Sequence, residues 1–133
     1  MKKVLTFGTF DTLHPGHEYY LKEAKRLGEK LYVVVALDET VKKVKGILPK
    51  NDEHHRLKKI KELKYVDEAI HGNKEDKLKV IEEINPDIIC IGYDQNSFTK
   101  DLQEKLMQRG LNPLIIKFSK GYKPHIYKSS KLR

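Results

Sequence analysis

Two short runs of this chain are apolar from end to end, and they constrain the fold more than any other feature. Residues 31–37 read Leu-Tyr-Val-Val-Val-Ala-Leu, and residues 88–91 read Ile-Ile-Cys-Ile. A strand that is apolar throughout, rather than at alternate positions, is typical of a parallel sheet covered on both faces. Neither run approaches the roughly 20 apolar residues that a membrane span requires.

Stretches with helical spacing alternate with these runs along the chain. Five strands separated by helices predict an α/β fold, with a single doubly wound five-stranded parallel sheet and one domain over residues 1–133. Ligands of such sheets bind beyond the carboxyl ends of the strands, where the strand order reverses. The expected strands are residues 4–7, 31–37, 66–70, 88–91 and 114–116. The expected helices are residues 15–27, 52–63, 78–84 and a segment around 102–106, with a Lys-rich loop after residue 37.

The composition narrows the class of protein. The 133 residues suffice for one domain, and 38% of them are apolar and clustered, which excludes a disordered chain. The start, Met1 to Leu5, has too short an apolar stretch for a secretory signal. Cys90 is the one cysteine, which excludes an intrachain disulfide and a cysteine-based zinc site, and it is expected to be buried. We expect a soluble, cytoplasmic protein with no membrane partner.

The chain is basic, since 27 Lys and Arg against 19 Asp and Glu give a formal net charge of +8. This charge fits either an anionic partner or a lysine-rich solvated surface. Nucleic-acid binders usually concentrate basic residues in runs interleaved with aromatics, whereas residues 42–45 and 58–61 are short runs among acids. A small anionic substrate explains this charge as well as a polyanion does, and a nucleotide-binding or RNA-binding module without catalysis is the alternative class.

The ten residues after the first strand carry the most specific pattern. Gly8 to His17 read Gly-Thr-Phe-Asp-Thr-Leu-His-Pro-Gly-His, and they lead into a helix whose N–H groups and dipole favour an anion. His14 and His17 are three residues apart, so both rings can lie on one side of the first turn. Pro15 suits a helix start, and Gly16 lets a ligand approach the backbone. Because no third metal ligand accompanies the histidines, the pattern favours phosphate over zinc.

With these residues the chain resembles the nucleotidyltransferase superfamily that carries an H-x-G-H signature, to which cytidylyltransferases and several adenylyltransferases belong. The small-enzyme form of the signature, G-T-F-D-x-x-H-x-G-H, is matched in full by residues 8–17. The resemblance implies a Rossmann-like nucleotidyltransferase fold and in-line attack on the α-phosphate of a nucleotide. Catalysis then relies on positioning and electrostatics, because a phosphate nucleophile is already ionised at neutral pH. Mg²⁺ or another divalent cation is expected to arrive with the triphosphate, without a metal site on the protein.

The resemblance also implies roles for individual residues. The catalytic residues are expected to be His14 and His17, which would stabilise charge on the α-phosphate. The tail resembles the second superfamily signature, whose hydroxyls bind the β- and γ-phosphates. The expected nucleotide-binding residues are Thr9, Phe10, His14, Pro15, Gly16, His17, Asp94, Tyr122, Ser129 and Ser130. Residues expected near the substrate phosphate are Asp11, Lys43, Lys45 and Arg56, although the two lysines read equally well as part of a solvated loop.

Two kinds of enzyme resemble this chain, and they differ in the substrate that accepts the nucleotidyl group. Glycerol-3-phosphate cytidylyltransferases have this length and a nearly identical first loop, but their R-T-x-G-I-S-T stretch is missing here. Archaeal FAD synthases resemble the chain better, through the Lys-rich residues 39–46 and Gly-Tyr-Asp-Gln at residues 92–95. This resemblance implies transfer of AMP from ATP to FMN, giving FAD and pyrophosphate. CTP-dependent transfer to glycerol 3-phosphate, or to another small phosphate ester, is the alternative. A homodimer is expected, because small relatives are commonly dimers.

Overall fold

Five short strands form one parallel sheet. They are β1 (Lys3–Gly8), β2 (Lys30–Val35), β3 (Glu68–His71), β4 (Ile88–Ile91) and β5 (Leu114–Lys117). The structure, a computed structural model, describes residues 2–13, 15–73, 76–91 and 101–117, and its strand order is β3-β2-β1-β4-β5. Across the centre of the sheet, Gly8 lies opposite Val35 of β2 and Thr6 lies opposite Cys90 of β4.

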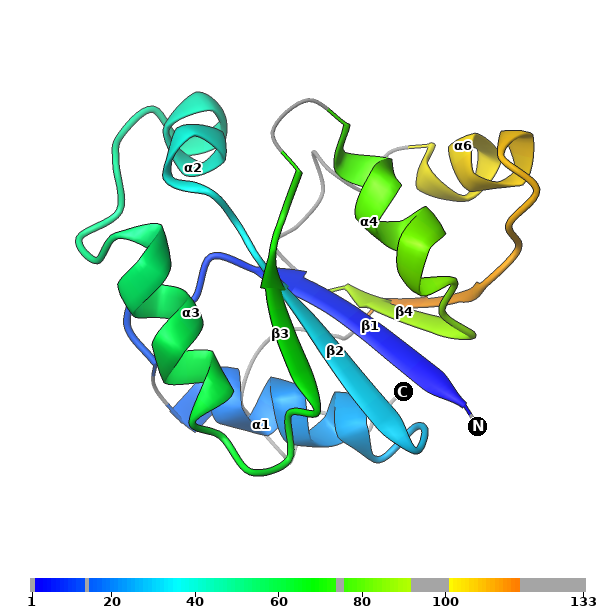
Figure 1. Cartoon of the computed structure of the whole chain (residues 1–133), viewed down its shortest axis with the longest axis horizontal. Helices are drawn as coiled ribbons and strands as arrows, with labels where there is room; N and C mark the ends of the chain where they lie inside the picture. Colours follow the sequence, from blue (N-terminus) through cyan, green and yellow to red (C-terminus); the bar gives the residue numbers. More distant parts are fainter. Residues whose placement is uncertain (1, 14, 74–75, 92–100, 118–133) are drawn as a thin grey trace.

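Helices cover both faces of this sheet (Figure 1). α1 (Pro15–Lys25) and α3 (Glu53–Lys61) pack on one face, and α4 (Lys77–Ile84) and α6 (Leu102–Gln108) pack on the other. Neighbouring residues of one strand therefore belong to the hydrophobic cores on opposite faces of the sheet. Val33 packs with α1 and α3, whereas Val34 packs with α4. Burying one such side chain is worth about 1.5–3 kcal/mol, so apolar residues are favoured at every position of a central strand. The expected doubly wound α/β fold is confirmed.

Cys90 lies in the core, as its sequence context predicts. Its side chain is fully buried in β4, and burial raises the pKa of its thiol to about 12. A thiol with such a pKa is protonated at neutral pH, so it acts as a small apolar residue. In the part of the chain that the structure describes, no helix has the length and apolar character needed to cross a membrane.

The segment after β2 differs from the expected Lys-rich loop, because residues Asp38–Lys45 form a helix, α2. Two acidic residues occupy its first turn and three lysines its last turn, which complements the helix dipole. Gly46 ends the helix in the left-handed conformation, with φ 86°, and donates its N–H to Lys42 O at 2.8 Å. Val41 is the single residue of α2 that is buried, and Val44, three residues further on, is 52% exposed, so α2 contributes little to the core.

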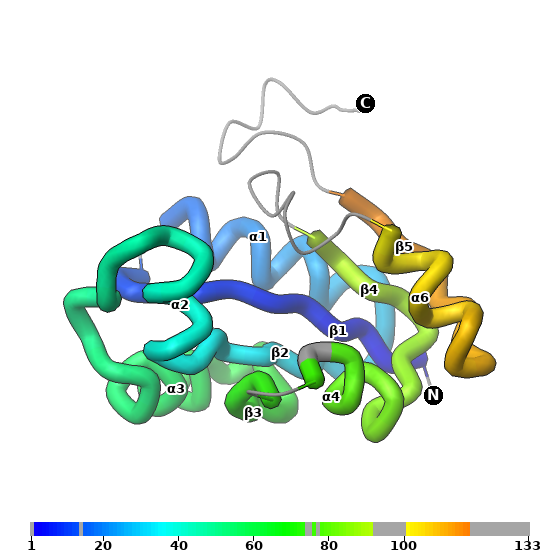
Figure 2. The backbone as a smooth tube through the Cα atoms, turned by 90° about the horizontal axis from the view of Figure 1, so that it is seen from above, coloured from blue at the N-terminus to red at the C-terminus, as the bar shows by residue number. Residues whose placement is uncertain are grey.

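The strand order reverses between β1 and β4. From β1 the chain adds β2 and then β3 on one side, and it then crosses to the other side of β1 to add β4 and β5. Residues 8–17, here called the motif loop, leave the carboxyl end of β1 at this switch point. Figure 2 shows this end of β1 on the same side of the molecule as α2 and α3. Loops at such a point are where doubly wound sheets bind ligands.

Candidate active site

Gly8, Phe10 and His17 of the motif loop form one packed unit. A Cβ atom at Gly8 would lie 2.5 Å from carbon atoms of the Phe10 ring, so this position has room for glycine alone. The Phe10 ring is 4% exposed and stands edge-on to the His17 ring, with the centroids 5.4 Å apart and the planes at 74°. The Nδ1 atom of His17 is buried. The first and third residues of the motif thus set the position of its last histidine.

The backbone of Phe10 is strained. Its φ of 51° lies in the left-handed region, which costs a residue with a side chain roughly 1–2 kcal/mol. Burial of the aromatic ring offsets this, since it is worth about 1.5–3 kcal/mol. Strain of this kind concentrates at functional sites, where the surrounding structure holds it in place.

His17 lies in the first turn of α1, and α1 begins at Pro15 as the sequence predicts. Pro15 suits this position because the first helical N–H has no partner inside a helix, and Glu18 adds an acidic side chain to the turn. The amino end of α1 presents N–H groups and a positive dipole end at the carboxyl edge of the sheet. This arrangement favours an anionic ligand such as phosphate.

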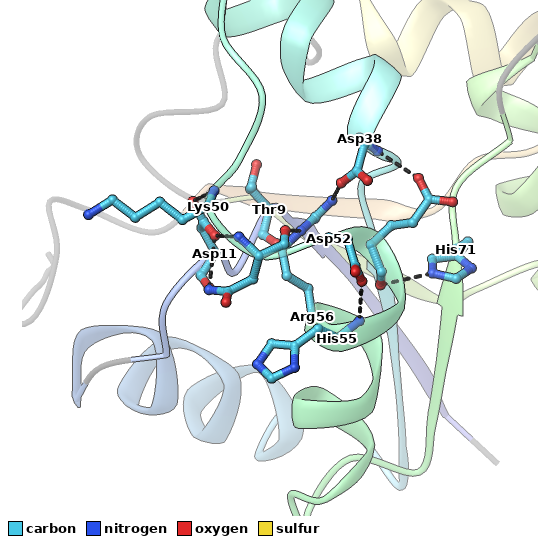
Figure 3. A network of polar contacts seen from close by, with 10 residues as sticks. Thr9, Asp11, Asp38, Lys50, Asp52, His55, Arg56 and His71 are labelled. Carbon is cyan, nitrogen blue, oxygen red and sulfur yellow. Dashed lines mark hydrogen bonds and ion pairs between the residues drawn. The ribbon is translucent and has the colours of Figure 1, made fainter.

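A buried guanidinium lies beside the motif loop (Figure 3). The Arg56 side chain is 0% exposed, and it donates from Nε to Asn51 O at 2.9 Å and from Nη1 to Thr9 O at 2.8 Å. Its Nη2 forms an ion pair with Asp38 Oδ1 at 2.7 Å. Arg56 is expected near the substrate phosphate from its place in the chain, and in the structure its guanidinium is surrounded by protein acceptors.

Asp11 ties the same loop to the α2–α3 linker, residues 46–52. Its carboxylate accepts the N–H of Lys50 and the N–H of Asn51, each at 2.8 Å, and the Asn51 side-chain amide at 3.2 Å. The Asn51 amide also donates to the backbone carbonyl of Asp11. Burial acts to raise the pKa of Asp11, but these hydrogen bonds and the charge of Arg56 outweigh it, so this pKa lies below its ordinary value. Asp11 is therefore a carboxylate at neutral pH.

A second layer of contacts continues this network to β3. The N–H of Asp38 donates to Glu53 Oε1 at 2.8 Å, and the backbone carbonyl of Glu53 lies 3.0 Å from His71 Nε2. Asp52 caps α3 by accepting the N–H of His55; the sequence allows either Asn51 or Asp52 in this role. The segments that follow β1 and β2, and the last residue of β3, are thus joined around the start of α3.

Tyr20, whose spacing from Leu21 and Ala24 puts it on the apolar face of α1, has a polar role as well. Its hydroxyl contacts the hydroxyl of Thr6 in β1 and donates to the carbonyl of Cys90 in β4 at 3.0 Å. Thr6 is 0% exposed, so this bridge satisfies a buried polar group between the two strands at the switch point. Helical spacing alone cannot reveal it, because a tyrosine on an apolar face is normally read by its ring.

The structure places some expected site residues and not others. Thr9, Phe10, Asp11, Pro15, Gly16 and His17 come together at the carboxyl edge, while Lys43 and Lys45 are exposed on the last turn of α2. Asp38 and Asn51 join the network without having been predicted; the acidic pair that opens α2 is the signal for Asp38. In the described ranges no group of three or more His, Cys, Asp or Glu is arranged to hold a metal ion. The expected residues His14, Asp94, Tyr122, Ser129 and Ser130 lie outside the described residues.

Comparison with known proteins supplies the family. A family model described as Cytidylyltransferase-like matches residues 5–133. A protein named FAD synthase from Thermoplasma acidophilum is 47% identical over 133 residues, which are 100% of this chain and 92% of that protein. FAD synthase from Methanobrevibacter smithii is 56% identical over 115 residues, which are 84% of this chain and 74% of that protein.

A solved structure agrees with the fold. It is titled as the lipopolysaccharide core biosynthesis protein from Thermoplasma volcanium GSS1, and it is 46% identical to this chain with a TM-score of 0.86. The match covers 92% of this chain and 99% of that one. The family model spans the motif loop at the switch point and every residue after it, so this chain belongs to the cytidylyltransferase-like family and is a nucleotidyltransferase.

Proposed function

We propose that this protein is an FMN adenylyltransferase, an FAD synthase. A phosphate oxygen of FMN attacks the α-phosphorus of ATP, and the bond from that phosphorus to the bridging α–β oxygen breaks. AMP is thereby joined to FMN as FAD, and pyrophosphate leaves with the electron pair of the broken bond. The support is the run of relatives named FAD synthase, among which a third, from Methanohalophilus mahii, is 42% identical over 99% of this chain.

The observation that carries the proposal is the position of the motif loop. It leaves the carboxyl end of the central strand at the switch point, and it holds His17 in the first turn of α1 against the Phe10 ring. An imidazole and a helix amino end are both suited to a phosphate group that gains negative charge during transfer. Neither group has to remove a proton, because the attacking phosphate of FMN is ionised at neutral pH.

The remaining site residues enter as parts of this proposal. His14 acts with His17 on the α-phosphate, and the motif-loop backbone at Thr9 and Phe10 lies along the triphosphate. Lys43 and Lys45 attract the phosphate of the acceptor from α2, where both side chains are exposed. Outside the described residues, the proposal assigns nucleotide contacts to Asp94, Tyr122, Ser129 and Ser130.

The divalent cation belongs, in this proposal, to the triphosphate rather than to the protein. The acidic side chain of the motif loop is Asp11, and its two oxygens already accept three N–H groups from the α2–α3 linker. Mg²⁺ binds through few protein carboxylates and many phosphate or water oxygens, so the substrate supplies the donors that it needs. When bound, it neutralises charge on the phosphates.

The test is a substrate assay on the purified chain. It is incubated with ATP, FMN and Mg²⁺, and FAD and pyrophosphate are quantified by chromatography and a coupled pyrophosphate assay. FAD and pyrophosphate in equal amounts are expected. A parallel incubation with CTP and glycerol 3-phosphate covers the alternative that the family description allows. Formation of CDP-glycerol without FAD would reverse the assignment.

Two further expectations are kept as proposals. The chain acts as one domain and as a homodimer, for which the support is the resemblance to small relatives; sedimentation velocity measures the mass directly. A location in the cytoplasm remains a prediction of the sequence.

A further inference from the structure

Arg56 combines a permanent charge with complete burial. A guanidinium stays protonated in proteins and has five N–H donors but no acceptor, so it is retained in a protein interior where acceptors surround it. Arg56 is 0% exposed, although α3, to which it belongs, carries histidines and lysines that are exposed on either side of it. Its position therefore calls for an explanation beyond a solvated helix face.

The partners of Arg56 come from three separate segments. Thr9 O belongs to the motif loop, Asn51 O to the α2–α3 linker, and Asp38 Oδ1 to the first residue of α2, at 2.8, 2.9 and 2.7 Å from the guanidinium. Figure 3 shows Arg56 reaching from α3 toward Thr9 and Asp38. One side chain thus joins the segments that follow β1 and β2.

The motif loop is held at a second point two residues further on. There Asp11 accepts N–H groups of Lys50 and Asn51, the residue whose carbonyl also accepts from Arg56. Between these two points lies Phe10, with its φ of 51° and its ring against His17. A shift of Thr9 or Asp11 would therefore move the Phe10 ring and, with it, the catalytic histidine.

We propose that Arg56 is a positioning residue that sets the motif loop and, through Phe10, the ring of His17, and that it does not bind substrate phosphate. All three guanidinium nitrogens donate to protein acceptors, and the side chain is 0% exposed. A phosphate could reach the two remaining N–H groups only if the segments packed around Arg56 moved apart. Asp38 acts with Arg56, because it orients the guanidinium and is itself held by Glu53. The inference rests on the proposed function only where it is tested by the rate of FAD formation.

The kinetic test compares Arg56→Lys and Asp38→Asn with the wild-type chain. A lysine has the charge but not the planar fork, so it cannot reach all three partners. A displacement of about 1 Å in an active site can reduce the rate ~100-fold, so kcat for FAD formation is expected to fall about 10- to 100-fold. KM for ATP and for FMN is expected to stay within about threefold, because substrate contacts are retained.

A double-mutant cycle separates coupling from two independent defects. The Arg56→Lys, Asp38→Asn double variant is expected to be no slower than the worse single variant, because both changes release the same loop. Arg26→Lys is the matched control. Arg26 is also paired with a carboxylate, that of Glu23, but its side chain is 77% exposed. The kcat of this variant is expected to equal that of the wild-type chain.

An NMR measurement tests the inference without any substrate, so it does not depend on whether FMN is the acceptor of the nucleotidyl group. The ring resonances of His17 are expected to shift in Arg56→Lys and in Asp38→Asn, and to stay at their wild-type positions in Arg26→Lys. All variants are measured well below their melting temperatures, and Asp38→Asn covers the case in which Arg56→Lys fails to fold.

Three results would overturn the inference. The first is a raised KM for ATP or FMN with kcat unchanged, which is what a phosphate clamp predicts. The second is a lowered melting temperature with unchanged kcat, which a purely structural ion pair predicts. The third is unmoved His17 resonances in a folded Arg56→Lys. If the wild-type chain itself makes no FAD, the proposed function fails, and the resonances of His17 still decide the inference.

Discussion

His17 brings together the features expected of a group that stabilises charge on a phosphate. It lies at the amino end of α1, one ring nitrogen is buried, and the Phe10 ring fixes its plane. Removing a positioned donor of this kind costs about 3–4 kcal/mol in the transition state, or roughly 10²–10³ in rate. We therefore expect His17→Ala to lower kcat for FAD formation by that factor while ATP binding, measured by calorimetry, changes much less.

His55→Ala is the matched control for His17, because this imidazole is exposed on α3 and the N-cap contact there is made by its backbone N–H. Its kcat should equal that of the wild-type chain. Equal turnover of both variants would remove His17 from the mechanism.

Gly8 is the residue at which a single carbon atom should disturb the site. In Gly8→Ala the new Cβ would lie 2.5 Å from the Phe10 ring, so the ring must move away from its contact with His17. We expect a fall in kcat of at least about tenfold in a protein that still folds. Gly72→Ala is the control at the end of β3, where the new Cβ would meet Val34 at an ordinary 3.5 Å. If steady-state kinetics show equal losses in both variants, the Phe10–His17 contact is not the cause.

α1 is anchored to the sheet by one hydroxyl in addition to its apolar face. The Tyr20 hydroxyl bridges Thr6 of β1 and the carbonyl of Cys90 in β4, while Leu21 and Ala24 fill the core beneath. Because Tyr20 is three residues from His17, this bridge fixes the helix close to the site. Tyr20→Phe leaves the buried Thr6 hydroxyl without this partner, which is expected to lower the free energy of unfolding by about 1–3 kcal/mol.

Urea unfolding measures this loss. Tyr32→Phe in β2 is the control, because Tyr32 is half-buried and its ring, which lies 6.0 Å from Lys30 Nζ, is kept in the variant. A change within about 0.5 kcal/mol is expected there. Equal losses in the two variants would mean that the hydroxyl bridge does not stabilise α1.

Two carboxylates at opposite edges of the sheet make the stability of the whole molecule depend on pH. Asp11 binds the α2–α3 linker at one edge, and Asp67 accepts Lys25 Nζ at 2.6 Å and the N–H of Leu31 at 2.7 Å at the other. Burial acts to raise both pKa values, but the hydrogen bonds and nearby positive charges outweigh it, so both lie below their ordinary values. The unfolded chain therefore takes up protons at a higher pH than the folded chain does.

The direction of the pH effect follows from these lowered pKa values. The stabilisation is complete above the unfolded pKa, near roughly pH 4, and is lost as the pH falls through the folded pKa values. Asp11→Asn should be less stable than the wild-type chain by about 1 kcal/mol at pH 7, and this difference should shrink as the pH falls through the lowered pKa of the folded chain. Urea titrations at several pH values test this, with Glu83→Gln on the exposed face of α4 as the control. A difference that stays constant with pH would contradict the account.

The elements that could be predicted from the sequence are those whose residue types depend on neighbours close in the chain. The strands 31–37 and 88–91 were predictable because burial on both faces leaves an unbroken apolar run. The ends of two helices were predictable to within a residue, because a capping side chain at Asn51 or Asp52, and the Asn85-Pro86 pair, act on residues close in sequence. α2 was missed because Val41 is its one buried residue, so its stability comes from terminal charges and Gly46 rather than from an apolar face.

The sequence alone determined the motif loop and its place between β1 and α1. Its residue types are required locally: Gly8 ends the strand where the Phe10 ring lies too close for a side chain, and Pro15 begins the helix. The surroundings of Arg56 were decided by the tertiary structure. Its partners Thr9 and Asp38 are 47 and 18 residues away along the chain, and nothing local distinguishes a buried guanidinium from an exposed one. Whether a charged side chain binds a substrate or holds a loop depends on which distant segments the packed sheet brings beside it.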